Sequence, residues 1–209
     1  EKTYLVPKSC EAAAFGGSSR DMALPRNAER YVQVYVITQH WGDAYSHFLS
    51  ECLPRVTLML DALLANPSIK IAMHAPPPNR NDREHYMAEF MAVLGIQEER
   101  LIFMDSEIHA DLAILPESTA CEKPNTAMIN MLRSALLKGI YPKSTGVPPP
   151  TSRPVILLIV RQLKGGLVNN DQVREALEAQ FPTHDVVQSF SHGPVLEQLR
   201  VFATAAVIV

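Results

Sequence analysis

The last third of the chain alternates strands with helices, and the first and last of its strands are apolar along their whole length. We expect strands at 155–160, 185–190 and 205–209, separated by helices at 171–180 and 194–204. A strand with no polar residues has both faces buried, which is typical of a parallel sheet covered by helices on both faces. This pattern predicts an α/β lobe.

The preceding part of the chain shows the same mixture of elements. Pro54 lies within one of its helices and lacks a backbone N–H, so we expect a kink or break just before it. Gly95 follows another helix and is expected to cap it. The strands are expected at 31–38, 69–73, 101–104 and 112–115, and the helices at 43–65, 82–94 and 125–138.

Between these two parts, the segment 141–154 is rich in proline and poor in apolar residues, which is typical of a linker. We therefore expect an irregular lead-in over 1–30, an N-terminal α/β lobe over 31–144 and a C-terminal lobe over 145–209. Because domains rarely end inside a buried strand, the apolar end of the chain leads us to expect that the second lobe is incomplete.

Composition excludes several classes of protein. With 47% hydrophobic residues and a net charge of −3, the chain fits a globular protein and lacks the basic excess of a nucleic-acid surface. It has no run of about 20 apolar residues that could span a membrane. Cys10, Cys52 and Cys121 show no metal-ligand spacing, so no zinc site is expected, and a disulfide among them is left open.

One group of candidate site residues lies at four-residue steps: Asp43, His47, Glu51 and Arg55. On a helix this spacing places them along one side, opposite the apolar stripe. They are either a solvated face with weak ion pairs or a set that faces a cleft. In a cleft, a carboxylate beside His47 would orient the ring for general base catalysis, and Arg55 would hold an anionic or polyhydroxylated ligand.

A second group follows the strand at 155–160. Arg161 comes directly after the strand, Lys164 is followed by two glycines, and Asn169 precedes a helix. Ligands of parallel sheets bind outside the carboxyl ends of the strands, and a loop before a helix offers free N–H groups to phosphate. We favour phosphate binding over an ordinary surface loop, although the loop is neither a P-loop nor GxGxxG.

The segment 45–55, YSHFLSECLPR, resembles the Y-x-H-F-L-x-E-x-L-P-R segment of family 61 glycosyltransferases. The strand ending in Arg161, with Asn169 and the next helix and strand, is similar to the family's strand-R-R-x-N-helix-strand block. The chain departs from the family at Gln162, where the second Arg is expected, and at Gly165 or Gly166. It also stops where the family's His-Gly-Ala motif would follow.

The resemblance implies a GT-B arrangement of two Rossmann-like lobes, the first for the acceptor and the second for the nucleotide-sugar. It implies inverting transfer of a sugar from a UDP-sugar to a hydroxyl of a glycan or glycoprotein. On this basis His47 and Glu51 are the candidate catalytic residues, and Arg161, Lys164 and Asn169 are the candidate donor-binding residues. Asp43 and Arg55 are expected at the acceptor or cleft.

No Asp-x-Asp motif is present, so we expect no essential metal and no cofactor beyond the UDP-sugar substrate. The resemblance also implies that the protein works in the lumen of the secretory pathway, in the Golgi or the endoplasmic reticulum. The alternative is a non-catalytic or degenerate α/β module that binds a nucleotide-sugar or a glycan.

Overall fold

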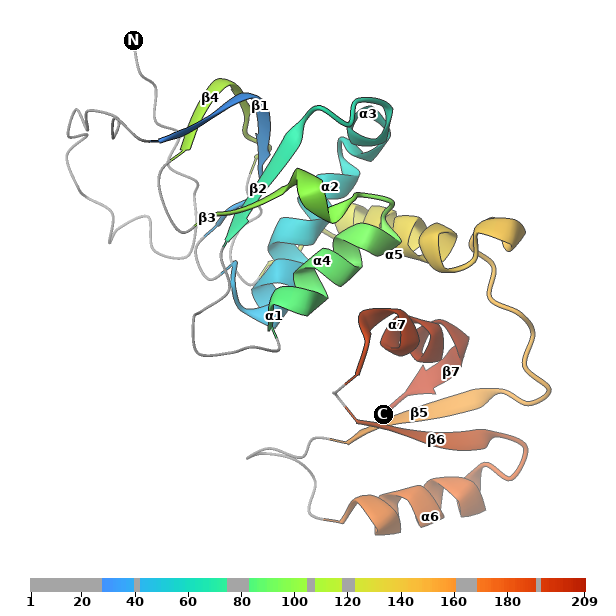
Figure 1. The fold of residues 1–209 in the computed structure, drawn as a ribbon. Coiled ribbons are helices and arrows are strands. Elements are labelled where there is room, and N and C mark those ends of the chain that lie inside the picture. Colours follow the sequence, from blue (N-terminus) through green and yellow to red (C-terminus); the bar gives the residue numbers. More distant parts are fainter. Residues whose placement is uncertain are drawn as a thin grey trace. The chain divides into compact units, whose positions relative to one another are not determined.

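The computed structural model describes residues 28–39, 42–74, 83–104, 108–117, 123–160, 169–190 and 193–209. The chain divides into two compact units, Glu1–Ala135 and Leu136–Val209 (Figure 1). The division falls within helix α5 (Thr126–Ile140). The lead-in over 1–30 and the boundary between residues 144 and 145 stay predictions, and almost all of the lead-in lies outside the described residues.

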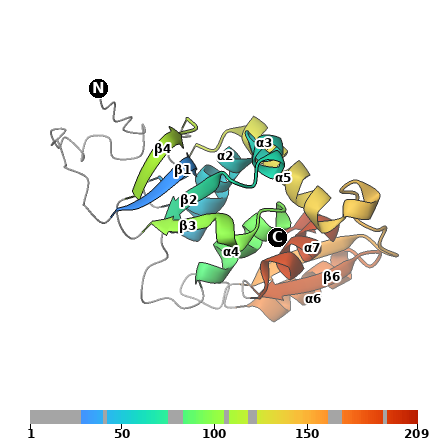
Figure 2. The ribbon, with the colours of Figure 1, turned by 45° about the horizontal axis from the view of Figure 1, so that its top comes forward.

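The first unit contains a four-stranded parallel sheet in the order β3-β2-β1-β4, which Figure 2 shows. The chain runs outward from β1 to β3 and then returns to the other side of β1. This change of direction makes a topological switch point at the carboxyl ends of β1 and β4. The strands are β1 (Glu29–Val36), β2 (Lys70–His74), β3 (Leu101–Met104) and β4 (Ile108–Ile114).

The strands of this sheet match the predicted positions except at β4. The sequence placed a strand at 112–115, but β4 begins at Ile108. The start of β4 contains His109 and Asp111, and Asp111 is bonded to Arg30 of β1 at 2.7 Å on an exposed face. The predicted strand began too late because an apolar run was required, and the first residues of β4 include polar side chains that pair across an exposed face.

The core of the first unit covers both faces of the sheet. The adjacent residues Val34 and Tyr35 point to opposite faces, and both are fully buried. On one face, Val34, Ala72 and Ile102 form a cluster against which partly buried side chains pack. The centre of this sheet is therefore buried on both faces.

A helical path follows β1. It consists of α1 (Tyr45–His47), the π-helix η1 (Phe48–Cys52), α2 (Leu53–Thr57) and α3 (Leu60–Ala65). In the π turn the Leu53 N–H donates to the Phe48 carbonyl. Pro54 has no N–H for the Ser50 carbonyl and its ring would clash with that carbonyl, so the wider turn accommodates it. The expected perturbation before Pro54 is confirmed.

Helix α4 (Arg83–Val93) joins β2 to β3 and packs against α1 and η1 through aromatic rings. Tyr45 and Tyr86 meet edge to face with ring centroids 5.0 Å apart, and Phe48 meets Tyr86 at 5.6 Å. Gly95 follows α4 with φ +82° and its N–H donates to the Ala92 carbonyl, so the expected glycine cap is confirmed. The short 3-10 helix η2 (Glu98–Arg100) leads into β3.

The second unit contains a three-stranded parallel sheet in the order β6-β5-β7. Its strands are β5 (Val155–Val160), β6 (Asp185–Phe190) and β7 (Ala205–Ile208). The connecting helices α6 (Asn170–Gln180) and α7 (Val195–Thr204) lie on opposite sides of the sheet in Figure 1. A short 3-10 helix, η3 (Pro142–Ser144), precedes β5.

The predicted α/β alternation of the second unit is confirmed, but its burial is less complete than predicted. Strand β5 is buried almost throughout, whereas Val207 and Ile208 of β7 are about half exposed. The prediction of burial on both faces is therefore wrong for β7, which lies at the edge of the sheet and has fewer neighbours. Among the described residues, no helix is long and apolar enough to cross a membrane.

Candidate functional site

The carboxyl end of the first sheet gathers the polar side chains that the sequence singled out at 43–55. The end of β1 leads through residues 37–39 and 42–44 into α1, and the end of β2 contributes His74. Because ligands of open parallel sheets bind at this edge, near the switch point, these residues form the candidate site of the first unit.

His47 and Glu51 form a close pair at this site. The Nδ1 atom of His47 lies 2.9 Å from Oε1 of Glu51, so the predicted contact between them is confirmed. The two side chains differ in exposure, at 22% for His47 and 1% for Glu51. In the tautomer with the proton on Nδ1, this atom donates to the Glu51 carboxylate and Nε2 has a lone pair for another group.

Arg55 is buried and binds backbone carbonyl groups. Its guanidinium donates to Val36, Ile37 and Thr38 at the end of β1, at 3.2–3.4 Å, and to Pro116 beyond β4 at 2.8 Å. Burial lowers the pKa of Arg55, but a guanidinium stays charged at neutral pH. Arg55 therefore joins the two strand ends that flank the switch point.

This geometry corrects one part of the sequence interpretation. The four-residue spacing predicted a polar side opposite an apolar stripe, but residues 51–57 are all buried. The solvated-face alternative is wrong for Glu51 and Arg55, because the helix packs here against the strand ends instead of lying at the surface. A direct contact of Arg55 with the acceptor stays a prediction.

Asp43 lies at the entrance to α1 and is partly exposed. Its backbone carbonyl accepts a hydrogen bond from the Tyr86 hydroxyl at 3.0 Å. Burial, with the charge of Asp43 next in importance, raises the pKa of Tyr86. The contact fixes the loop before α1 against α4, and the role of Asp43 toward an acceptor stays a prediction.

The same loop approaches β2 closely at Gly42. A Cβ atom at this position would lie 2.6 Å from Cδ2 of His74 and 2.9 Å from Sγ of Cys52, so only glycine fits without a shift. Cys52 is free and buried, and burial is the main cause that raises its pKa to about 12. It is therefore a thiol in the core and not a nucleophile. Cys10 and Cys121 lie outside the described residues.

The second group of candidates is described only in part. Arg161 and Lys164 lie outside the described residues, whereas Asn169 immediately precedes α6. The Asn169 side chain makes no capping hydrogen bond to the helix. Asn169 therefore leaves the first N–H groups of α6 without a side-chain cap. Uncapped N–H groups at a helix N-terminus are able to donate to an anion.

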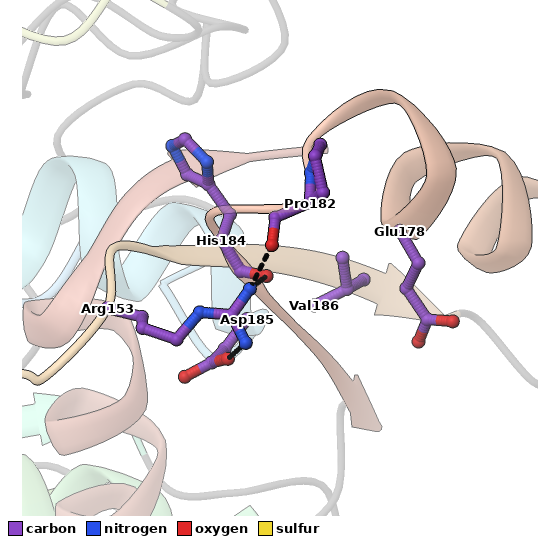
Figure 3. Close-up of a pocket in the computed structure, with 6 residues that line it drawn as sticks. All are labelled: Arg153, Glu178, Pro182, His184, Asp185 and Val186. Atoms are coloured by element: carbon purple, nitrogen blue, oxygen red, sulfur yellow. Dashed lines mark hydrogen bonds and ion pairs between the residues drawn. The ribbon is translucent and has the colours of Figure 1, made fainter.

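A cavity of about 340 Å³ lies at the opposite, amino end of the second sheet (Figure 3). Arg153 crosses it and donates to the carbonyls of Thr183 and His184 at 3.3 and 3.0 Å, and to that of Pro182. Its Nη1 also pairs with Asp185 at 3.0 Å. None of these residues was a candidate from the sequence, and Arg153 and Asp185 neutralise each other, so this cavity is not the candidate site. Its lining is Arg153, Glu178, Pro182, His184, Asp185 and Val186.

Among the described residues, no group of three or more His, Cys, Asp and Glu side chains is placed to hold a metal ion.

Comparison with known protein families identifies a family for most of the chain. A sequence model of the family described as Glycosyltransferase 61 matches residues 45–209. This range includes His47, Glu51 and Arg55, as well as all three donor-site candidates, whereas Asp43 precedes it. No curated protein and no solved structure matches the chain significantly.

Proposed function

The chain belongs to the glycosyltransferase 61 family, and from this premise we propose that it transfers a sugar from a UDP-sugar to a hydroxyl of a glycan or glycoprotein with inversion at the anomeric carbon. The observation that carries the proposal is the pair of His47 and Glu51 at the carboxyl end of β1, with one member accessible and the other buried.

The difference in exposure supports one division of the two roles that the sequence left open. His47 is the residue that an acceptor can reach, so its Nε2 atom is the proposed general base. Glu51 accepts from Nδ1 and holds the ring in the tautomer that leaves Nε2 free. The acceptor oxygen attacks the anomeric carbon, its proton passes to Nε2, and the bond to the diphosphate breaks so that UDP leaves with the electron pair. Attack opposite the leaving group inverts the configuration.

The leaving diphosphate needs positive charge, which we assign to the second unit. Arg161 and Lys164 follow β5 in the sequence, and α6 begins directly after Asn169. Both cationic side chains and the N-terminal N–H groups of a helix stabilise phosphate oxygens. This arrangement supports donor binding without an essential metal.

We also propose that the two units are the Rossmann-like lobes of a GT-B enzyme, with the acceptor on the first and the UDP-sugar on the second. The parallel sheets support this, because in each of them the strand order changes direction at the first strand. We further propose that the protein works in the lumen of the Golgi or endoplasmic reticulum, which imaging of the tagged full-length protein in its own cells would test.

The function is tested by UDP release from UDP-xylose, UDP-arabinose and UDP-N-acetylglucosamine, with methyl glycosides offered as acceptors. One donor should release UDP faster when an acceptor is present, and NMR should show the inverted linkage. Binding of UDP without turnover of any donor would instead support the non-catalytic module.

Arg161→Ala separates donor binding from the rest of the site. Loss of a charged hydrogen bond to phosphate should weaken UDP binding by about 1.5–3 kcal/mol. Titration with UDP measures this, and Arg153→Ala is the matched control because that side chain lies in the same unit and serves a loop. Unchanged UDP affinity in a folded Arg161→Ala protein would remove Arg161 from the donor site.

A further inference from the structure

Gln39 is a buried polar residue that the catalytic proposal does not use. It lies three positions after the end of β1 and is 3% exposed. Within the described part of the chain, neither its amide nitrogen nor its amide oxygen has a hydrogen-bond partner. Buried polar side chains are nearly always hydrogen-bonded, because an unpaired one loses its interactions with water without replacement.

The backbone of Gln39 is held in place by its neighbours. Nε2 of His74 contacts both its backbone nitrogen, at 2.9 Å, and its carbonyl oxygen, and this carbonyl also accepts from the Gly42 N–H at 2.9 Å. The preceding carbonyl, that of Thr38, accepts from Arg55 at 3.3 Å. The residue is thus fixed between the end of β2 and the guanidinium at the switch point, where ligands of such sheets bind.

The chemistry of the unpaired group indicates its ligand. A primary amide offers a donor and an acceptor side by side, and a hydroxyl group both accepts and donates. A sugar with neighbouring hydroxyls satisfies both amide atoms at once. A site that binds a hydroxyl in this way also rejects analogues without it, because the amide is then left unpaired.

We propose that Gln39 binds hydroxyl groups of the acceptor sugar and so contributes to acceptor specificity. The inference rests on the proposed function for the identity of the substrate. It does not follow from the family match, which begins at residue 45.

The test measures sugar binding and UDP binding separately on the full chain. The probes are the methyl glycosides of xylose, mannose and N-acetylglucosamine, followed by saturation-transfer NMR, with UDP followed by calorimetry. Gln39→Met keeps the length of the side chain and removes the amide. It should weaken binding of the preferred glycoside about tenfold, as expected for loss of a hydrogen bond or two, and leave UDP affinity unchanged.

Gln188→Met is the matched control. Gln188 lies on β6 in the second unit, and its amide nitrogen is likewise buried without a partner in the described structure. Both substitutions remove a buried amide nitrogen that has no partner, so neither should lower the thermal midpoint. Only Gln39→Met should reduce sugar binding.

Gln39→Glu gives a second measurement should the methionine variant fold poorly. A protonated carboxylic acid still has one donor and one acceptor, so this variant should bind the glycoside at low pH and lose it once the carboxyl ionises. A wild-type chain that binds none of the three glycosides would overturn the inference. Equal sugar affinity in the Gln39→Met and wild-type proteins, both folded, would do the same.

The outcomes also separate this inference from the proposed function. Glycoside binding that depends on Gln39, without turnover of any UDP-sugar, would uphold the sugar site and reject the transferase. Turnover that is unaffected by Gln39→Met would uphold the transferase and reject the sugar contact.

Discussion

Arg55 and Arg153 both bind backbone carbonyl groups at one end of a parallel sheet, yet they differ in exposure and in the groups around them. Arg55 lies at the carboxyl end of the first sheet, is 3% exposed, and donates to carbonyls from both sides of the switch point. Arg153 lies at the amino end of the second sheet, with its side chain 46% exposed and paired with Asp185.

The difference shows which end of a sheet is available for chemistry. At the amino end, Arg153 and Asp185 neutralise each other and hold a loop, so the cavity beside them offers little to a ligand. At the carboxyl end, the buried guanidinium joins strand ends, and the pair of His47 and Glu51 stands beside them on the same helical path. Whether the charged side chains of a cavity are already paired with each other therefore indicates more about its function than its size does.

The largest expected effect in this comparison is on turnover at the carboxyl end. His47→Ala removes the proposed base and should lower the rate of sugar transfer about 10²–10⁴-fold with UDP affinity unchanged. Glu51→Gln should lower it less, because the amide can still contact the ring but orients it poorly. Steady-state kinetics with the best UDP-sugar measures both variants.

Ser46→Ala is a suitable control for that experiment, because Ser46 is exposed and adjoins His47, and the substitution keeps the backbone carbonyl that accepts from the Ser50 hydroxyl. Its rate should match the wild type. Near-normal turnover in both His47→Ala and Glu51→Gln would mean that the pair is structural and that the base lies elsewhere in the protein.

The next largest effect is on stability. Arg55→Met keeps an aliphatic side chain but removes the donors, which leaves carbonyls at the ends of β1 and β4 unpaired. The free energy of unfolding should fall by about 3 kcal/mol. Urea unfolding followed by the fluorescence of Trp41, the one tryptophan of the chain, measures the change.

Arg55→Lys sharpens the same test. A lysine keeps the charge but lacks the planar fork that reaches both strand ends, so most of the loss should remain. If Arg55→Met lowers the free energy of unfolding by less than about 1 kcal/mol, buried Arg55 would contribute no more to stability than half-exposed Arg153.

How far the sequence predicted these features depends on where the signal lies. Strand β5 was predicted to the residue, because an unbroken apolar run between proline and a polar loop has one good interpretation. The contact of His47 with Glu51 followed from helical spacing. The role of Arg55 did not, because its carbonyl partners come from β1 and from Pro116, 61 residues away, and backbone acceptors leave no mark on the sequence.

A smaller effect is expected from alkaline pH on the first unit. Burial raises the pKa of the Cys52 thiol and of the Tyr35 phenol, each to about 12. The folded protein then keeps both protons where the unfolded chain loses them. Stability is fully present below the unfolded values of about 8.5 and 10 and falls as the pH rises from there toward 12.

Urea unfolding at a series of pH values up to 10.5, followed by Trp41, tests this dependence. Cys52→Ala should flatten the fall that begins near pH 8.5, although the lost side chain also lowers stability at every pH. An identical slope in Cys52→Ala and in the wild type would show that other groups cause the alkaline loss.

The smallest effect is expected at Arg153. Its bonds to the carbonyls before β6 and its ion pair with Asp185 all lie in a half-exposed site, where water replaces what a substitution removes. Arg153→Ala should therefore lower the free energy of unfolding by no more than about 1 kcal/mol and leave UDP binding and turnover unchanged. Urea unfolding followed by circular dichroism, with the same kinetic assay, checks both. A loss of turnover in a stable Arg153→Ala protein would reverse the comparison, because it would place a functional group in the cavity at the amino end of the second sheet.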